Sequence, residues 1–309
     1  MKTASTYNGL KAYRLENEQI EVVIIPELGG KIASFKRKRN QLELLFQTKN
    51  PYSKPSAFDD FSLFHPSGID DCFPSINEEE VEINGERLNY PDHGEIWSSR
   101  MAESLENTSD EVLNLVYESN LFQYRYEKKI HLEENGLVLS YKITNLGMKD
   151  FYCFYTFHGL FRYESDLQIE YPKDTAEILN VLEHEVLGKV GDTHPFPVTD
   201  NYDFRKSGSG EQPDMIKYYV NHKTQDGNCA LVYTELATKV SLQYDAEKLP
   251  YLGVWITRGG FQGDYNLALE PSSGFYDSIG KARSNHKLNC LQPGECFDFE
   301  LKITLSDVF

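Results

Sequence analysis

The sequence predicts an all-β protein built as a large antiparallel sandwich, with residues 1–309 in a single domain. Strand-like segments follow one another at short intervals along the chain, and Asn-Gly pairs mark hairpin turns between some of them. No linker interrupts the series, and no alternation of helices and strands is present. The 20 Tyr and 18 Phe residues are typical of half-buried strands. We therefore expect two sheets that share one core.

The first part of the chain is predicted to contain short strands followed by a long loop. Gly29 and Gly30 form a turn between the first two of these strands. Residues Asn50–Ile76 are expected to be a loop, because four prolines interrupt the segment. The predicted strands are Gln19–Pro26, Lys31–Phe35 and Leu42–Phe46.

The middle of the chain is predicted to be a series of hairpins. Asn84-Gly85 and Asn135-Gly136 are turn pairs that favour two-residue hairpin loops. The segments expected to form strands here are both arms of the hairpin at Val81–Leu88, then Val112–Glu118, Phe122–Leu132 and Leu137–Thr144.

A strongly aromatic stretch, Tyr152–Ser165, reads YCFYTFHGLFRYES and is typical of a buried strand. It carries His158, and Gly159 follows directly, which permits another group to approach the backbone closely. For this histidine considered alone, a core residue with a satisfied hydrogen bond is the favoured interpretation.

The remainder of the chain returns to strands after one expected helix and one expected mobile loop. Thr175–Leu187 has partial helical spacing, and Asp200–Asp214 is polar and contains Ser-Gly-Ser-Gly. Strands are predicted at Leu167–Tyr171, Ile216–Val220, Ala230–Thr234, Val240–Tyr244, Tyr251–Thr257, Asn266–Glu270 and Phe297–Leu305.

The composition disfavours several classes of function. A formal net charge of −17 argues against nucleic acid or an anionic membrane as a partner, since both require a basic face. The five cysteines are scattered without a Cys-x-x-Cys pair, so neither a metal site nor a disulfide framework is expected. No phosphate-binding glycine motif supports a nucleotide cofactor. We expect no cofactor and, without an apolar leader or a membrane-spanning run, a cytoplasmic location.

Three residues before position 100 are candidates for sugar binding. Asp70 and Asp71 lie beside a glycine and an aromatic residue, and their carboxylates would accept hydrogen bonds from hydroxyl groups. A solvated acidic turn is the alternative. Trp97 would provide a stacking surface for the apolar face of a sugar, or would belong to the core.

Glu270 is the candidate base. It ends an apolar strand and precedes Pro271, where a carboxylate would be partly buried. Burial raises the pKa of a carboxyl group and makes the ionised form a better base. An ordinary glutamate at a strand end is the alternative.

The order of these features resembles the aldose 1-epimerase (galactose mutarotase-like) superfamily. The resemblance rests on His93-Gly94 near Trp97, His158 in an aromatic strand, and Leu269-Glu270-Pro271 near the C-terminus. It implies a β-supersandwich in which His158 protonates the ring oxygen, Glu270 takes the proton of the anomeric hydroxyl and His93 orients the sugar. It also implies that neither a metal nor a nucleotide is required.

Two departures from the galactose mutarotase pattern concern the substrate. The first motif reads His-Gly-Glu, and Phe161 is followed by Arg162. The latter pattern is similar to the hexose-6-phosphate mutarotase branch. That branch has an arginine shortly after its first His-Gly, whereas here position 97 is Trp and Arg100 comes later. Arg100 or Arg162 would be the clamp in this chain, and an ordinary strand arginine is the favoured alternative.

The leading hypothesis is therefore a cofactor-independent aldose 1-epimerase that acts on a small sugar, as a monomer or homodimer. The alternatives are a hexose-6-phosphate 1-epimerase and a non-catalytic carbohydrate-binding protein with the same fold. A lyase or glycosidase is a third class. In a glycosidase, Asp70 or Asp71 would act with Glu270 across the scissile bond, a role that the histidine fits poorly.

Overall fold

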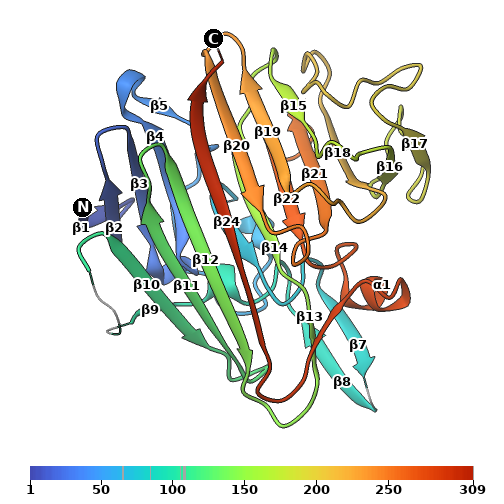
Figure 1. The fold of residues 1–309 in the computed structure, drawn as a ribbon. Coiled ribbons are helices and arrows are strands. Elements are labelled where there is room, and N and C mark those ends of the chain that lie inside the picture. Colours follow the sequence, from blue (N-terminus) through green and yellow to red (C-terminus); the bar gives the residue numbers. More distant parts are fainter. Residues whose placement is uncertain (65, 84, 105, 107–108, 309) are drawn as a thin grey trace.

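Two large antiparallel sheets lie against each other in the computed structural model, which describes residues 1–64, 66–83, 85–104, 106 and 109–308. Figure 1 shows the layers: β24, β12 and β11 run side by side in one sheet, and β14, β22 and β21 belong to the other. The predicted all-β sandwich is thereby confirmed. Within the described residues, no helix has the length and apolar character that a bilayer crossing requires.

The larger sheet has twelve strands in the described part of the chain. In spatial order these are β1 (Lys2–Tyr7), β2 (Leu10–Glu16), β3 (Ile20–Ile25), β4 (Lys31–Arg37), β6 (Gly68–Cys72), β14 (Thr156–Arg162), β22 (Tyr265–Ser272), β21 (Tyr251–Arg258), β18 (Asp214–Val220), β16 (Glu177–Asn180) and β17 (Thr193–Pro195), with β5 (Leu42–Glu43) paired to β4.

The second sheet and the small elements complete the fold. The eight strands described in the second sheet are, in order, β15 (Gln168–Glu170), β19 (Asn228–Tyr233), β20 (Thr238–Tyr244), β24 (Cys296–Asp307), β12 (Gly136–Asn145), β11 (Tyr124–Leu132), β10 (Val112–Glu118) and β9 (Ala102–Glu103). Two-stranded sheets pair β13 (Phe151–Cys153) with β23 (Asn289–Leu291) and β7 (Glu79–Ile83) with β8 (Glu86–Tyr90), and the helices are η1 (Pro26–Leu28), η2 (Lys38–Asn40), η3 (Phe61–Leu63), η4 (Ile96–Ser98) and α1 (Ile279–Ser284).

The core lies between the two sheets and follows the alternation of each strand. Along β24 every second side chain is buried, and these are Phe297, Phe299, Leu301, Ile303 and Leu305. Along β14 the buried rings of Phe157 and Phe161 belong to the same core. Because successive side chains of a strand point to opposite faces, His158 and Leu160 project from the other face of the larger sheet. That outer face carries the site described below.

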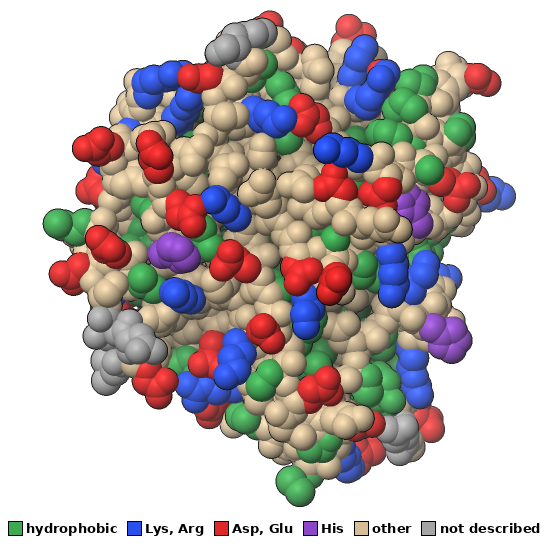
Figure 2. Space-filling view, in the orientation of Figure 1, with side chains coloured by type: hydrophobic (Ala, Val, Ile, Leu, Met, Phe, Trp, Pro, Cys, Tyr) green, Lys and Arg blue, Asp and Glu red, His purple; other side chains and the backbone are tan. Residues whose placement is uncertain are grey.

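The exposed face of the smaller sheet carries mixed charges. Figure 2 shows lysine and arginine side chains interspersed with aspartate and glutamate over this face, without a large area of either sign. The cross-strand register places Lys142 of β12 between Glu127 of β11 and Asp298 of β24. Such opposite-charge neighbours stabilise an antiparallel sheet.

A buried ion pair joins the two sheets near their centre. Lys128 Nζ of β11 donates to Asp71 Oδ2 of β6 at 2.7 Å, and the side chains of both residues are fully buried. The hydroxyl groups of Tyr141 and Tyr155 donate to the other carboxylate oxygen at 2.9 and 2.8 Å. The same ammonium donates to the carbonyl oxygen of Gly30 at 3.1 Å. Both oxygens of the buried Asp71 carboxylate therefore accept hydrogen bonds from groups inside the protein.

The structure corrects three predicted elements. Asn50–Ile76 is not all loop, because β6 lies within it and forms a central strand of the larger sheet. Tyr152–Ser165 is not one strand, since β13 pairs with β23 before β14 enters the larger sheet. Thr175–Leu187 is not helical, and contains β16, which pairs with β17 and β18.

Most other predicted strands are confirmed, with small changes of boundary. The predicted Val112–Glu118 is β10 without change, whereas the strand predicted at Leu42–Phe46 is reduced to β5. The predicted hairpin at Val81–Leu88 is formed by β7 and β8, and Asn84 of its turn lies outside the described residues. The N-terminal strands β1 and β2 were not predicted.

We expect Lys128→Met to lower the free energy of unfolding by about 3–5 kcal/mol, because it leaves the carboxylate of Asp71 buried without a counter-charge. Urea unfolding of Lys128→Met, Asp71→Asn and the double variant measures this. The double variant should recover part of the loss. Lys239→Met, which breaks the partly exposed pair with Glu170, is the control and should change stability little. A Lys128→Met protein as stable as the control would contradict the assignment.

Candidate active site

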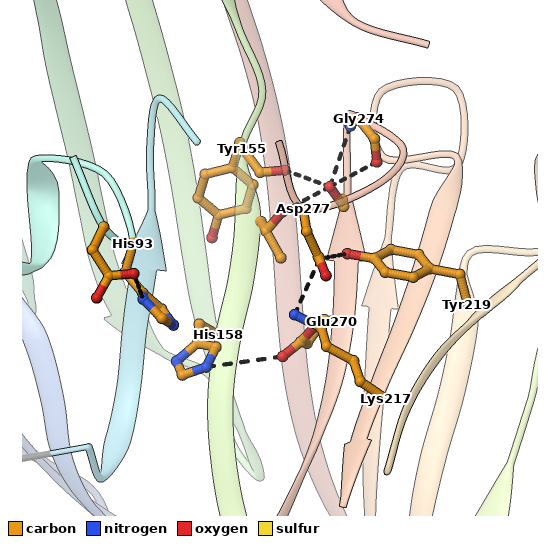
Figure 3. A network of polar contacts seen from close by, with 11 residues as sticks. His93, Tyr155, His158, Lys217, Tyr219, Glu270, Gly274 and Asp277 are labelled. Atoms are coloured by element: carbon orange, nitrogen blue, oxygen red, sulfur yellow. Dashed lines mark hydrogen bonds and ion pairs between the residues drawn. The ribbon is translucent and has the colours of Figure 1, made fainter. Parts of the chain in front are cut away.

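One row of residues across the outer face of the larger sheet brings the two predicted catalytic residues together. In the register of β14, His158 lies opposite Asp70 of β6. The pairs Thr156–Ser272 and Leu160–Ala268 on the other side place His158 opposite Glu270 of β22. Residues opposite each other in an antiparallel pair share a face, so the imidazole and the carboxylate are neighbours. Figure 3 shows them pointing toward each other.

A cavity of about 440 Å³ lies over this row. Its volume is within the range of sites that bind small molecules. Loops before and after β6, after β8, after β16, after β21 and after β22 form its walls. The described residues that line it are Phe61, Ser62, Pro66, Ile76, Asn77, Asp92, His93, His158, Leu160, Val181, Leu182, Lys217, Trp255, Phe261, Asn266, Glu270 and Asp277.

The side chains of His158 and Glu270 are buried but leave polar atoms without partners. His158 Nε2 lies 3.9 Å from Glu270 Oε1, too far for a hydrogen bond. Within the described chain, His158 Nδ1 and both carboxylate oxygens of Glu270 have no hydrogen-bond partner, although Glu270 is only 1 % exposed. Unsatisfied buried groups are costly, so such an arrangement in a cavity is typical of a site that acts on a ligand.

Burial shifts the protonation of both residues. It raises the pKa of the Glu270 carboxyl, although the charge of Lys217 acts in the opposite direction. It lowers the pKa of His158 well below the ordinary value, and electrostatic interactions with His93 and Lys217 add to this effect. The ionised carboxylate is consequently a stronger base, and the protonated imidazole a stronger acid, than in water.

His93 lies on the opposite wall and is fixed by Asp92. Nδ1 of His93 is 2.7 Å from Asp92 Oδ1, and because an ionised carboxylate only accepts, Nδ1 carries the proton. This interaction lowers the pKa of Asp92, although burial acts in the opposite direction. The imidazole stacks on Phe61 with ring centroids 4.1 Å apart, and it lies 5.2 Å from the ring of His158. The structure thus brings His93 together with His158 and Glu270 in one cavity.

Lys217 of β18 is a cation that the sequence analysis did not identify. Its Nζ lies 3.0 Å from Asp277 Oδ1 and 3.6 Å from Glu270 Oε2, as Figure 3 shows for the first contact. Trp255 was also missed as an individual residue. It lies opposite Lys217 in the register, lines the cavity and donates from Nε1 to Asn266 Oδ1 at 3.2 Å. Both residues lie in ordinary strand patterns, so local sequence carried no signal for them.

The structure does not place Asp70 or Asp71 in the wall of the cavity. Asp71 points into the core, where Lys128 and two tyrosines hold it. Asp70 shares the face of His158, but Lys31 Nζ is 2.5 Å from its Oδ2 and both side chains are almost completely buried. The prediction that these carboxylates contact sugar hydroxyls is therefore corrected, because each is already paired with a lysine.

Three further candidates also lie outside the cavity lining. Trp97 is buried beneath Phe61, with ring centroids 5.1 Å apart, and donates from Nε1 to the carbonyl oxygen of Asp92. It is a core residue that supports the wall. Arg100 lines a separate surface depression near Glu27, and Arg162 is exposed and paired with Glu164. Neither arginine is placed to hold a phosphate in the cavity.

Among the described residues, no cluster of three or more His, Cys, Asp or Glu side chains has an arrangement suited to a metal ion. His158 and Glu270 are two groups of the cavity that can exchange protons with a bound molecule. One proton can be removed by Glu270 and one delivered by His158 within a few ångströms, which is the capability of a general acid–base catalyst.

Comparison with solved structures identifies the fold. The chain superimposes on the Slr1438 protein of Synechocystis sp. PCC 6803 with a TM-score of 0.75, 18% identity and 96% of each chain covered. It superimposes on a galactose mutarotase-like protein of Clostridium acetobutylicum with a TM-score of 0.74, 15% identity, and 100% and 99% of the two chains covered. For an Escherichia coli K12 protein provisionally named an aldose 1-epimerase, the values are 0.73, 19%, and 96% and 99%. The protein has the galactose mutarotase-like fold.

Comparisons by sequence are less informative. Residues 189–305 match a domain family described as a domain of unknown function, DUF4432. This segment includes Lys217, Glu270 and Asp277 but neither His93 nor His158. No curated protein matches the chain in sequence.

We expect Glu270→Gln to increase the stability of the protein at neutral pH. Burial raises the pKa of Glu270 above its value of about 4.3 in the unfolded chain. The folded state therefore loses stability as pH rises from about 4.3 through the raised pKa. A neutral amide removes the penalty of a buried charge that lacks hydrogen bonds, which we estimate at about 1–3 kcal/mol. Thermal unfolding from pH 4 to pH 8 should show the gain growing with pH. A constant difference, or a less stable variant at pH 8, would contradict the burial argument.

Proposed function

We propose that the protein is an aldose 1-epimerase that interconverts the α and β anomers of a small, uncharged sugar. The observation that carries the proposal is the pairing of His158 and Glu270 in the cavity, with Nε2 and Oε1 3.9 Å apart and their other polar atoms unpartnered within the described chain. The shared fold with mutarotase-like proteins supports it.

The reaction needs one proton removed and one delivered at neighbouring oxygens. Glu270 takes the proton of the anomeric hydroxyl while His158 protonates the ring oxygen, and the bond between the anomeric carbon and the ring oxygen breaks. The open-chain aldehyde rotates about its bond to the next carbon, and the reverse transfers close the ring from the other side. Both oxygens are attached to one carbon, so acid and base must lie close together, as they do here.

The remaining cavity residues fit the binding of a pyranose. Trp255, Phe61 and Phe261 present aromatic surfaces suited to the apolar faces of a sugar ring. His93, Asn266 and Asp277 supply polar groups that would orient hydroxyls. His93 would present Nε2 to the sugar, because Asp92 engages Nδ1.

The competing functions find less support in the cavity. A carbohydrate-binding protein would have no need for a buried acid and base kept free of partners. A glycosidase that uses Glu270 with Asp70 or Asp71 is not supported, because both aspartates are paired with lysines outside the cavity. A phosphate site would require a free cation. Among the described lining residues, Lys217 is the only lysine or arginine, and it already lies between Glu270 and Asp277.

Replacing either member of the pair should abolish most of the activity. We expect His158→Asn and Glu270→Gln each to lower kcat for anomer exchange by about 10²-fold or more, since each removes one proton-transfer group. Saturation-transfer NMR on glucose and galactose measures the exchange rate. Trp97→Phe, which changes a supporting residue beneath the wall, is the matched control and should lose much less. Near-native exchange in His158→Asn or Glu270→Gln would refute the mechanism.

The enzyme should prefer a neutral aldose to its 6-phosphate. Three carboxylates of the cavity wall, Asp92, Glu270 and Asp277, would repel a phosphate, and Lys217 does not outweigh them. We expect kcat/KM for glucose or galactose to exceed that for the corresponding 6-phosphate by at least about tenfold, equivalent to about 1.4 kcal/mol. Parallel anomer-exchange measurements test this, and a preference for the phosphate ester would overturn the substrate class.

A further inference from the structure

Lys217 stands beside the proposed base in a position fixed by other residues. Its Nζ lies 3.0 Å from Asp277 Oδ1, which also accepts a hydrogen bond from the hydroxyl of Tyr219 at 2.6 Å. The backbone carbonyl of Asp277 accepts from the amide of Asn77 at 2.7 Å. The lysine is therefore anchored on the side away from Glu270, and its ammonium remains in place whether or not that glutamate is ionised (Figure 3).

Glu270 depends on this ammonium because its carboxylate has no hydrogen-bond donor within the described chain. The titratable or charged groups that face it are Lys217 and Tyr219 of β18, His158 of β14, Cys72 of β6, His93 of the loop after β8 and Asp277 of the loop after β22. Lys217 is the permanent cation of this set. Its Nζ is 3.6 Å from Glu270 Oε2, close enough for a strong charge interaction in a buried site.

The backbone keeps this carboxylate free of a close neighbour on the remaining side. Gly253 of β21 lies opposite Glu270 in the register. A Cβ atom at this position would be 3.0 Å from Glu270 Oε2 and 3.0 Å from Tyr219 Cζ. Because Gly253 has no side chain, the Glu270 carboxylate has room beside the cavity and the ammonium of Lys217.

We propose that Lys217, anchored by Asp277, is a positioning residue that keeps the carboxylate of Glu270 ionised and oriented for proton abstraction. The proposal rests on the proposed function and adds to it the group that sets the lower pH limit of the activity. It assigns Asp277 the task of holding the lysine rather than taking part in proton transfer.

A covalent role for Lys217 is not supported. Its pKa is raised, because the charges of Asp277 and Glu270 outweigh the opposite effect of burial. A protonated amine has no free electron pair with which to attack the aldehyde of an open-chain sugar. The lysine therefore acts through its charge.

The acid limb of the pH–rate profile tests the proposal. In the wild type, kcat/KM falls at low pH as Glu270 takes up a proton and falls at high pH as His158 loses one. Without the ammonium, Glu270 is protonated at higher pH. We expect Lys217→Met to shift the acid limb upward by about one pH unit or more, so that the rate falls about tenfold at low pH and recovers as pH rises. Lys217→Arg should keep most of the wild-type profile.

Two control variants separate this role from others. Tyr219→Phe removes one hydrogen bond to Asp277 and should shift the acid limb in the same direction by a smaller amount. Lys239→Met removes a lysine from a partly exposed ion pair on the other sheet and should leave the profile unchanged. A Lys217→Met enzyme with a raised KM at every pH and an unshifted acid limb would show that Lys217 binds the sugar directly, which would overturn the proposal.

A measurement that needs no substrate distinguishes failure of this proposal from failure of the proposed function. At pH 8, Lys217→Met should lower Tm strongly in the wild-type background and less in the Glu270→Gln background, where no charge requires compensation. Asp277 loses its ion pair with Lys217 in both backgrounds, so that effect cancels. Equal losses would refute the coupling between Lys217 and Glu270. A wild type without anomer exchange on any sugar, together with unequal losses, would refute the proposed function and leave the coupling standing.

Discussion

Two consecutive aspartates in the centre of the larger sheet fix the structure around the site. Asp70 and Asp71 of β6 point to opposite faces, and each meets a lysine: Lys31 on the outer face and Lys128 between the sheets. Both pairs are buried, so neither partner can leave without exposing a charge to an apolar environment. A shift of β6 by one residue would exchange the two faces and break both pairs at once. The register of β6, and with it the place of His158 on β14, depends on this arrangement.

The glycine pair before β4 makes the inner ion pair possible. Gly29 and Gly30 have φ values of +64° and +69°, which favour glycine. A Cβ atom on Gly29 would lie 2.0 Å from the carbonyl oxygen of Ile96, and the carbonyl of Gly30 accepts a hydrogen bond from Lys128. The turn that the sequence analysis placed here thus supplies a ligand to the buried ammonium as well as reversing the chain.

Sequence patterns predicted the fold, which the structure confirms, and singled out His158 and Glu270, which the structure places side by side, but not the residues that surround them. The strand β24 was evident because its side chains alternate between core and solvent over twelve residues. In contrast, β6 was not recognisable as a strand, because its two aspartates are buried in ion pairs with lysines that lie 39 and 57 positions away in the sequence. Because these lysines are distant in sequence, no local pattern indicated that Asp70 and Asp71 were already paired when they were predicted to bind sugar. Lys217 was not identified because its position beside Glu270 arises from the cross-strand register, which no local pattern encodes.

The outer face carries two lysine–carboxylate pairs on either side of His158, and they differ in a way that separates structure from function. Lys31 Nζ donates a hydrogen bond to Asp70 Oδ2 at 2.5 Å, so the lysine both neutralises this carboxylate and occupies one of its oxygens. Lys217 and Glu270 are 3.6 Å apart without a hydrogen bond to the carboxylate, because Asp277 holds the ammonium more closely. The first pair satisfies a buried carboxylate; the second stabilises its charge while leaving its oxygens free for a ligand. A proton acceptor needs that second condition, since an oxygen already engaged by a strong donor is a weaker base. The sheet thus presents one carboxylate that a lysine engages directly and one whose oxygens stay free, with only β14 between their two strands and with the same type of counter-ion.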